Sequence, residues 1–298
     1  MTAYKNGDNM KIKATYKLFL TFCFYHTIAH SFPGYEKLVF YKTQETLDKI
    51  KQIISDKQKG WYLRIGVGEL IIINGHNDQE QNTDRRLATE LKEAFAFNGP
   101  TVLKSLPIHC RELGGWEKGM TLNLNHERPL GTCLTYLEWA KGHWNGSIAD
   151  VYSPVALHFA ATQYPAMCAN FLKSLKAANC ALLVGNQHIP KNIRTLLLGD
   201  KCAFIPVVPT NCYKDIDSLE QQVYQILPKN DDYKVIITCM GPAGKALQKR
   251  LWNKLNNVFL FDFGSFIDAI CGWDTRAWIT DVHFNAQQYV AFLEKELN

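Results

Sequence analysis

Three short segments of this sequence place glycines beside charged or polar side chains directly after an apolar run. They are Arg64-Ile65-Gly66-Val67-Gly68-Glu69, Gly241-Pro242-Ala243-Gly244-Lys245, and Asp262-Phe263-Gly264-Ser265 with Asp268 three residues later. Glycines let the backbone approach a ligand closely. An arginine can bind a phosphate through both arms of its guanidinium, and a carboxylate can orient or deprotonate a hydroxyl. Together these residue types could bind an anionic ligand beside a reacting hydroxyl.

Each segment also has a purely structural interpretation. Glycines after a strand often mark only a tight turn. The segment from Gly241 to Lys245 lacks the spacing of a Walker loop, so an ATPase is not supported, and Lys245 could lie on a solvated helix face. Ser265 followed by Asp268 has the spacing of a helix capping box.

The elements around these segments predict an α/β fold with a Rossmann-like sheet flanked by helices. Apolar runs alternate with amphipathic stretches, which is typical of βα units. Ligands in such sheets bind at the carboxyl ends of the strands, where Gly185 and Asn186 also follow a strand. Strands are expected at residues 61–65, 102–108, 180–184, 202–208, 235–239 and 258–261, and one long helix is expected after Pro154 through Leu175. Residues 112–146, rich in Gly, Trp, His and Asn, are expected to form a loop that walls or covers the site.

Composition indicates one globular domain at residues 43–298, preceded by an N-terminal extension at 1–42 that packs on it. The 298 residues are 47% apolar and 20% charged, which is ordinary globular usage. The net charge of +5 suits an anionic ligand and permits nucleic acid. The apolar stretch Leu18–Ala29 is interrupted by polar residues and is too short to span a bilayer, so we expect neither a signal peptide nor a membrane span.

Cysteine and histidine usage points away from a metal framework. The nine cysteines form no CxxC pair, which favours free thiols in a reducing compartment such as the cytoplasm. His126, His143, His158 and His188 show no metal-ligand spacing.

Taken in order, the three segments resemble those of the GT-D type of glycosyltransferase, a family formerly described as a domain of unknown function. That family has Arg-Phe-Gly-Asp-Gly-Glu where this chain has Val67 in place of the Asp. Its Gly-Pro-x-Ala-x-x-Leu is similar to Gly241–Leu247, with Gly244 in place of the Ala. Its Asp-x-Gly-His is similar to Asp262-Phe263-Gly264-Ser265, with Ser265 in place of the His. The resemblance extends over roughly residues 43 to 270 and includes the stretch from Pro209 to Ser218.

The resemblance implies a single GT-D domain that transfers a hexose or pentose from a nucleotide sugar, most simply a UDP-sugar, to a hydroxyl of a glycan or glycoprotein. Glu69 and Asp268 are then the expected catalytic acids. The expected donor-binding residues are Arg64, Gly66, Gly68, Gly185, Asn186, Gly241, Lys245, Asp262, Gly264 and Ser265.

The resemblance also implies a divalent metal, manganese or magnesium, held by the family's Asp-x-Glu pair. Val67 supplies no carboxylate here, so Glu69 is the remaining candidate ligand. We therefore expect weak or absent dependence on divalent cations, with Arg64 and Lys245 neutralising the diphosphate.

Two other functions remain open. Trp116, Trp139 and Trp144 could stack on the bases of nucleic acid as well as on sugars, which would fit a glycosyltransferase acting on a modified base in DNA. The loss of the family's Asp at Val67 would fit a degenerate protein that binds nucleotide or glycan without turnover.

Overall fold

The computed structural model describes residues 38–117, 129–144, 150–178, 180–227 and 232–297. The chain divides into Met1–Leu38 and Val39–Asn298, and the second unit contains all the helices and strands described. Nearly all of the expected N-terminal extension, including Leu18–Ala29, lies outside the described residues. Within the described part of the chain, no helix has the length and apolar character needed to cross a bilayer.

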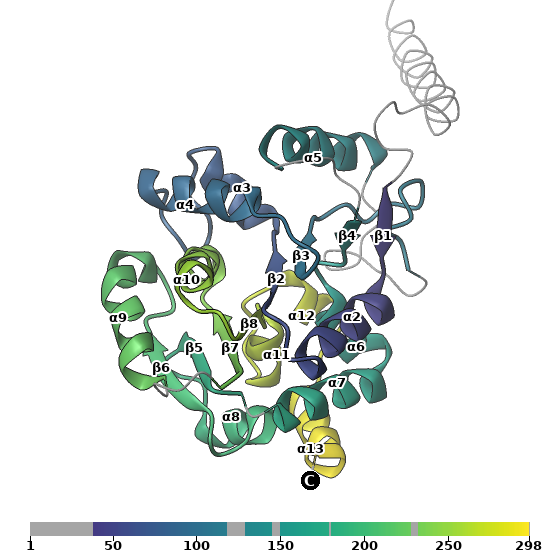
Figure 1. The fold of residues 1–298 in the computed structure, drawn as a ribbon. Helices are drawn as coiled ribbons and strands as arrows, with labels where there is room; N and C mark the ends of the chain where they lie inside the picture. The colour runs from purple at the N-terminus through teal and green to yellow at the C-terminus, as the bar shows by residue number, and fades with distance from the viewer. Residues whose placement is uncertain (1–37, 118–128, 145–149, 179, 228–231, 298) are drawn as a thin grey trace, which may run out of the picture. The chain divides into compact units, whose positions relative to one another are not determined.

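The centre of the fold is an eight-stranded parallel sheet with strand order β1-β4-β3-β2-β8-β7-β5-β6 (Figure 1). Because every strand runs the same way, all the carboxyl ends meet at one edge of the sheet. The predicted α/β fold with a Rossmann-like sheet is therefore confirmed. The strands are β1 (Val39–Tyr41), β2 (Gly60–Arg64), β3 (Val102–Ser105), β4 (Asp150–Tyr152), β5 (Leu182–Asn186), β6 (Ala203–Val207), β7 (Lys234–Cys239) and β8 (Val258–Asp262).

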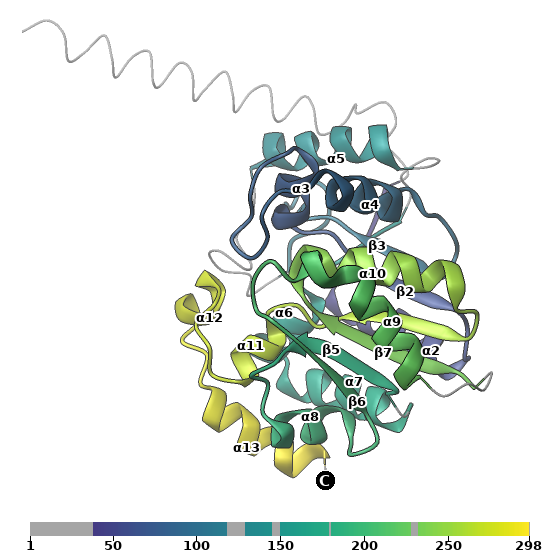
Figure 2. The same cartoon turned by 90° about the vertical axis from the view of Figure 1, so that its left-hand side faces the viewer.

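Helices cover both faces of the sheet (Figures 1 and 2). One layer contains α3 (Val67–Ile73), α4 (Arg85–Ala96), α9 (Ile216–Ile226) and α10 (Gly241–Lys254), with α5 (Leu130–His143) beside α4. The other contains α2 (Thr43–Ser55), α6 (Ala156–Gln163), α7 (Pro165–Ala177), α8 (Lys191–Leu198), α11 (Phe266–Ile270) and α13 (Ala286–Leu297). Two short helices, η1 (Cys212–Asp215) and α12 (Ala277–Asp281), lie in the connections after β6 and α11.

The two layers explain why the central strands are apolar along their whole length. Strand β8 is buried at every position, and Phe259 and Phe261 are fully buried in the main core. A parallel strand covered by helices on both faces has no solvent side, so its sequence does not alternate. This burial fixes β8 rigidly beside β2 and β7 and so holds Asp262, its last residue, at the ligand edge.

Two sequence predictions were wrong in detail. The single helix expected after Pro154 is two helices, because Pro165 starts α7 and its ring and missing N–H cannot continue α6. The stretch expected to be a loop at 112–146 contains the 14-residue helix α5. Its buried residues recur at helical spacing: Leu130, Cys133, Leu137 and Ala140. The many glycine, tryptophan and histidine residues around them led to the prediction of a loop.

Candidate functional site

A cleft of about 370 Å³ opens at the carboxyl ends of the central strands. It lies where ligands bind in sheets of this type. Three of the predicted donor-binding glycines do not line it: Gly66 and Gly68 belong to the start of α3, and Gly185 packs inside β5 against Ile189 and Cys239. The predicted residues that do line the cleft are Arg64, Glu69, Asn186, Gly241, Lys245, Gly264, Ser265 and Asp268.

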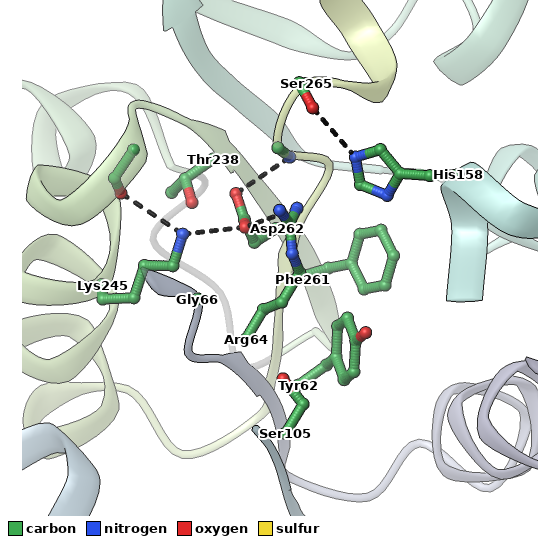
Figure 3. A network of polar contacts seen from close by, with 12 residues as sticks. Tyr62, Arg64, Gly66, Ser105, His158, Thr238, Lys245, Phe261, Asp262 and Ser265 are labelled. Atoms are coloured by element: carbon green, nitrogen blue, oxygen red, sulfur yellow. Dashed lines mark hydrogen bonds and ion pairs between the residues drawn. The ribbon is translucent and has the colours of Figure 1, made fainter. Parts of the chain in front are cut away.

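The floor of the cleft is a buried network of two cations and two acids, which we call the floor quartet: Arg64, Glu69, Lys245 and Asp262. Lys245 Nζ lies 2.9 Å from Asp262 Oδ2 and 3.1 Å from Glu69 Oε1, and Arg64 Nη1 lies 3.3 Å from the same Asp262 oxygen. Figure 3 shows Lys245 and Arg64 converging on Asp262 from different elements. The quartet joins β2, α3, α10 and β8, and its four charges cancel.

Local backbone structure fixes both acids of the floor quartet. Glu69 Oε2 accepts the Gly66 N–H at 2.8 Å, which caps the start of α3, so both oxygens of Glu69 have partners. Asp262 Oδ1 accepts the Gly264 N–H at 3.1 Å. Gly264 has φ +53°, and a side chain there would collide with the Arg64 guanidinium, so this position requires glycine.

The floor quartet keeps Asp262 and Lys245 charged although they are buried. Burial alone would raise the pKa of Asp262, but the charges of Lys245 and Arg64 outweigh it and the pKa is lowered. Burial would likewise lower the pKa of Lys245, but Asp262 and Glu69 outweigh it and the pKa is raised. Lys245 is thus a buried ammonium in the cleft, not the solvated lysine of the structural interpretation.

The rim of the cleft contains residues that sequence reasoning missed. Arg276, just before α12, forms an ion pair with Glu80, and its Nη1 donates to Gln79 Oε1 at 2.9 Å. Next to Arg276 in the chain, Thr275 Oγ1 donates to Asp268 Oδ2 at 2.6 Å. Burial raises the pKa of Asp268, while Thr275 and Arg276 oppose that shift. The only sequence signal for Glu80 was a polar loop after a helix, and nothing linked it to a residue 196 positions away.

Asn211 holds the Glu80 loop over the strand ends. Its N–H donates to the Glu80 carbonyl at 2.8 Å, and its Oδ1 accepts the Asn82 N–H at 2.7 Å. Asn211 has φ +54°, a left-handed conformation that asparagine tolerates better than most residues. The connection after β6 therefore fixes the backbone of the loop that carries Glu80.

Comparison with known proteins identifies the fold. No family model and no curated protein matches the sequence. A solved structure described as a new glycosyltransferase (DUF1792) from Streptococcus sanguinis superposes with a TM-score of 0.56 at 18% identity, covering 79% of this chain and 84% of that one. A second, described as domain of unknown function 1792 with a distinct glycosyltransferase fold, has a TM-score of 0.54 at 17% identity, covering 80% and 81%.

This chain has the DUF1792 glycosyltransferase fold. The structural match therefore agrees with the GT-D resemblance of the three sequence segments. Those segments lie at the ends of β2, β7 and β8, which are neighbours in the order β2-β8-β7. The three segments, which are far apart in the sequence, are therefore neighbours at one edge of the sheet.

Val67, which the sequence resemblance is expected to set in place of the GT-D aspartate, begins α3. The remaining acid, Glu69, has one oxygen on the Gly66 N–H and the other on Lys245. Among the residues with described positions, no three His, Cys, Asp or Glu side chains are grouped to hold a metal ion. The residues of this floor do not fit a carboxylate-held cation.

Ser265, which the sequence resemblance is expected to set in place of the GT-D histidine, contacts a histidine from elsewhere in the chain. Its Oγ accepts from Trp278 Nε1 at 2.9 Å and lies 3.3 Å from His158 Nε2 (Figure 3). Burial, followed by the charges of Arg64, Lys245 and Arg276, holds the pKa of His158 well below 6.5, so the ring is neutral. The Ser265 side chain makes no capping hydrogen bond to α11, so the predicted capping box is absent there.

Proposed function

We propose that the cleft binds the diphosphate of a nucleotide sugar and that the protein transfers the sugar, a hexose or a pentose, to an acceptor hydroxyl. The observation that carries this proposal is the position of the floor quartet, which places the cations Arg64 and Lys245 in the lining of the strand-end cleft of a glycosyltransferase fold. Fixed cations beside a leaving diphosphate stabilise the charge that develops as the glycosidic bond breaks. A UDP-sugar is the first donor to test.

The start of α10 supplies the second part of the diphosphate site. Gly241 and Lys245 from its first turn line the cleft. Unpaired amides and the positive end of the helix dipole favour an anion at such a position. Arg64 approaches from β2, so the diphosphate would lie between β2 and α10.

Asp268 is the acid best placed to act as the general base. It lines the cleft, and its raised pKa strengthens it as a proton acceptor. In the transfer step the acceptor oxygen forms a bond to the anomeric carbon while the bond to the diphosphate oxygen breaks. The diphosphate leaves with that electron pair, and Asp268 takes the acceptor proton. Glu69, with both oxygens engaged, positions Lys245 instead of acting on the acceptor.

We further propose that transfer does not require a divalent cation, because both oxygens of Glu69 are already bonded to the Gly66 N–H and to Lys245 and none is left to hold a metal. Activity measured with and without EDTA tests this directly. Transfer that survives EDTA supports it, whereas loss of transfer that manganese restores would overturn it.

A glycan or glycoprotein hydroxyl is the acceptor that we favour over DNA. Trp139 stacks on His143 and packs against Phe95, and Trp144 also packs edge-on against Phe95. These two rings contribute to packing and do not form an open stacking surface for bases. A panel of UDP-, GDP- and TDP-sugars, scored for binding, hydrolysis and transfer, tests the function. No binding to any member would refute the glycosyltransferase proposal, and binding without turnover would favour the degenerate binder.

A further inference from the structure

The Glu80 carboxylate occupies the place where an anion is best stabilised in the cleft. A side chain added at Gly241 would collide with Glu80 Oε2, so the carboxylate lies directly over the first residue of α10. Gly241 has φ +54° and tolerates this approach because it carries no side chain. The positive end of the α10 dipole and the Arg276 guanidinium both face this position.

While the Glu80 carboxylate lies over Gly241, the described cleft residues have no net positive charge with which to attract a diphosphate. The cations Arg64, Lys245 and Arg276 line the cleft together with the acids Glu69, Glu80 and Asp268. Asp262 adds another negative charge directly beneath, paired with Lys245 and Arg64. His158 behind Ser265 is neutral. An incoming diphosphate would therefore meet a cleft in which acids outnumber cations, which disfavours its binding.

Glu80 is the acid that can give way. Glu69 and Asp262 have both oxygens engaged in the floor, and their side chains are only 7% and 0% exposed. The Glu80 side chain is 26% exposed, and its ion-pair partner Arg276 comes from a separate segment of the rim. Asn211 holds the Glu80 backbone, so the side chain can rotate away while the loop stays in place.

We propose that Glu80 is an internal competitor of the donor diphosphate and that Arg276 is a donor-binding residue. On donor binding, a phosphate replaces the Glu80 carboxylate over Gly241, and Arg276 exchanges its ion pair with Glu80 for one with the phosphate. This inference rests on the proposed nucleotide-sugar function and adds to it a specific anion exchange at the rim.

Removing the charge of Glu80 should therefore strengthen donor binding. Isothermal titration of UDP and of inorganic pyrophosphate in EDTA should give a Kd lower by roughly tenfold for Glu80→Gln than for the natural protein, since tenfold corresponds to one desolvated charge contact of moderate strength. Arg276→Gln should raise the Kd by a similar factor. In the double variant the gain from Glu80→Gln should be smaller than in the single variant, because no guanidinium remains to be released and only the repulsion by the carboxylate is removed.

Glu93→Gln is the matched control, since Glu93 pairs with Lys249 on the surface, outside the cleft. It should leave both Kd values unchanged, and thermal melting should show all four variants folded. Weaker or unchanged binding of UDP and pyrophosphate by folded Glu80→Gln would overturn the inference. A Glu80→Gln variant that binds them only after manganese is added, and more weakly than the natural protein, would overturn it as well. Tighter pyrophosphate binding by Glu80→Gln without binding of any nucleotide would support the exchange and refute the proposed function. No binding of either probe by any protein would refute both.

Discussion

Helix α10 takes part in two charged networks, and they differ in what they face. Near its start, Lys245 pairs with Glu69 and Asp262 at the strand-end cleft. Five residues further along the helix, Arg250 Nη2 lies 2.6 Å from Glu90 Oε1, and its Nη1 lies 2.6 Å from Asp217 and 3.2 Å from Glu220. The Arg250 network joins α4, α9 and α10, and none of its members lines the main cleft.

The contrast separates a structural network from a ligand-facing one on the same helix. Arg250 lies between packed helices, and its partner Asp217 is 66% exposed, so the network links helix surfaces. Lys245 is buried at the strand ends. Apolar side chains at these positions would avoid the desolvation cost of the buried ion pairs, so stability alone does not explain the charges. Buried charges that face a cleft indicate a functional site more strongly than charges that bridge helices.

The largest expected effect comes from Lys245→Met. This change leaves Asp262 and Glu69 buried without their shared cation, which should cost about 3–5 kcal/mol in the free energy of unfolding. It should also abolish measurable donor binding, because the diphosphate loses its fixed ammonium. Urea unfolding and calorimetry test the two parts. A folded variant that binds UDP-sugar normally would show that Lys245 is only structural.

Asp268→Asn should lower transfer by roughly 100- to 10,000-fold, the range for loss of a general base. Binding of UDP should not weaken, because Asp268 contacts Thr275, belongs to no ion pair of the floor quartet, and adds negative charge to the cleft lining. The measurement is the initial rate at saturating donor. Full activity in this variant would remove Asp268 from the mechanism.

Arg250→Met should disrupt the Arg250 network and lower the free energy of unfolding without changing donor binding. We expect a loss of roughly 2 kcal/mol, since Glu90 and Glu220 lose a buried hydrogen-bond partner while Asp217 keeps its contact with solvent and Arg86. The Kd for donor should match that of the natural protein. A change in Kd comparable to that of Lys245→Met would mean that the two networks are not functionally separate.

The smallest effect is a dependence of stability on pH through His158. Its folded-state pKa is lowered, so as pH falls below about 6.5 the unfolded chain binds a proton that the folded chain does not, and stability is lost. Between pH 7.5 and 5.5 this single group should contribute a loss of about 1 kcal/mol. Chemical unfolding across that range should show a shallower slope for His158→Gln. Equal slopes for His158→Gln and the natural protein would mean that His158 does not cause this loss of stability.

The sequence predicted six of the eight strands and the floor of the site because both depend on local patterns, whereas the three-residue strands β1 and β4 were not expected. Apolar runs marked β2, β5, β7 and β8, and the polar residues after them had to meet at one edge of a parallel sheet. Arg64, Lys245 and Asp262 were found in this way and lie together in the structure.

The rim could not be predicted because it depends on contacts between distant loops. Glu80 and Arg276 lie in connections without periodicity, and only the folded chain brings them together. His158 lies on buried helix α6, where nothing in the sequence linked it to Ser265. The engagement of Glu69 was also hidden, because Glu69 satisfies the start of α3 and Lys245 at once.

In our proposal, the cleft binds a nucleotide-sugar diphosphate through fixed protein cations. The most direct measurement is calorimetric titration of UDP-sugars, with GDP- and TDP-sugars alongside, into the natural protein, Lys245→Met and Arg250→Met, all in EDTA. We predict saturable binding of at least one donor to the natural protein and to Arg250→Met, and none to Lys245→Met. Absence of binding to the natural protein, or equal binding by Lys245→Met, would contradict the account.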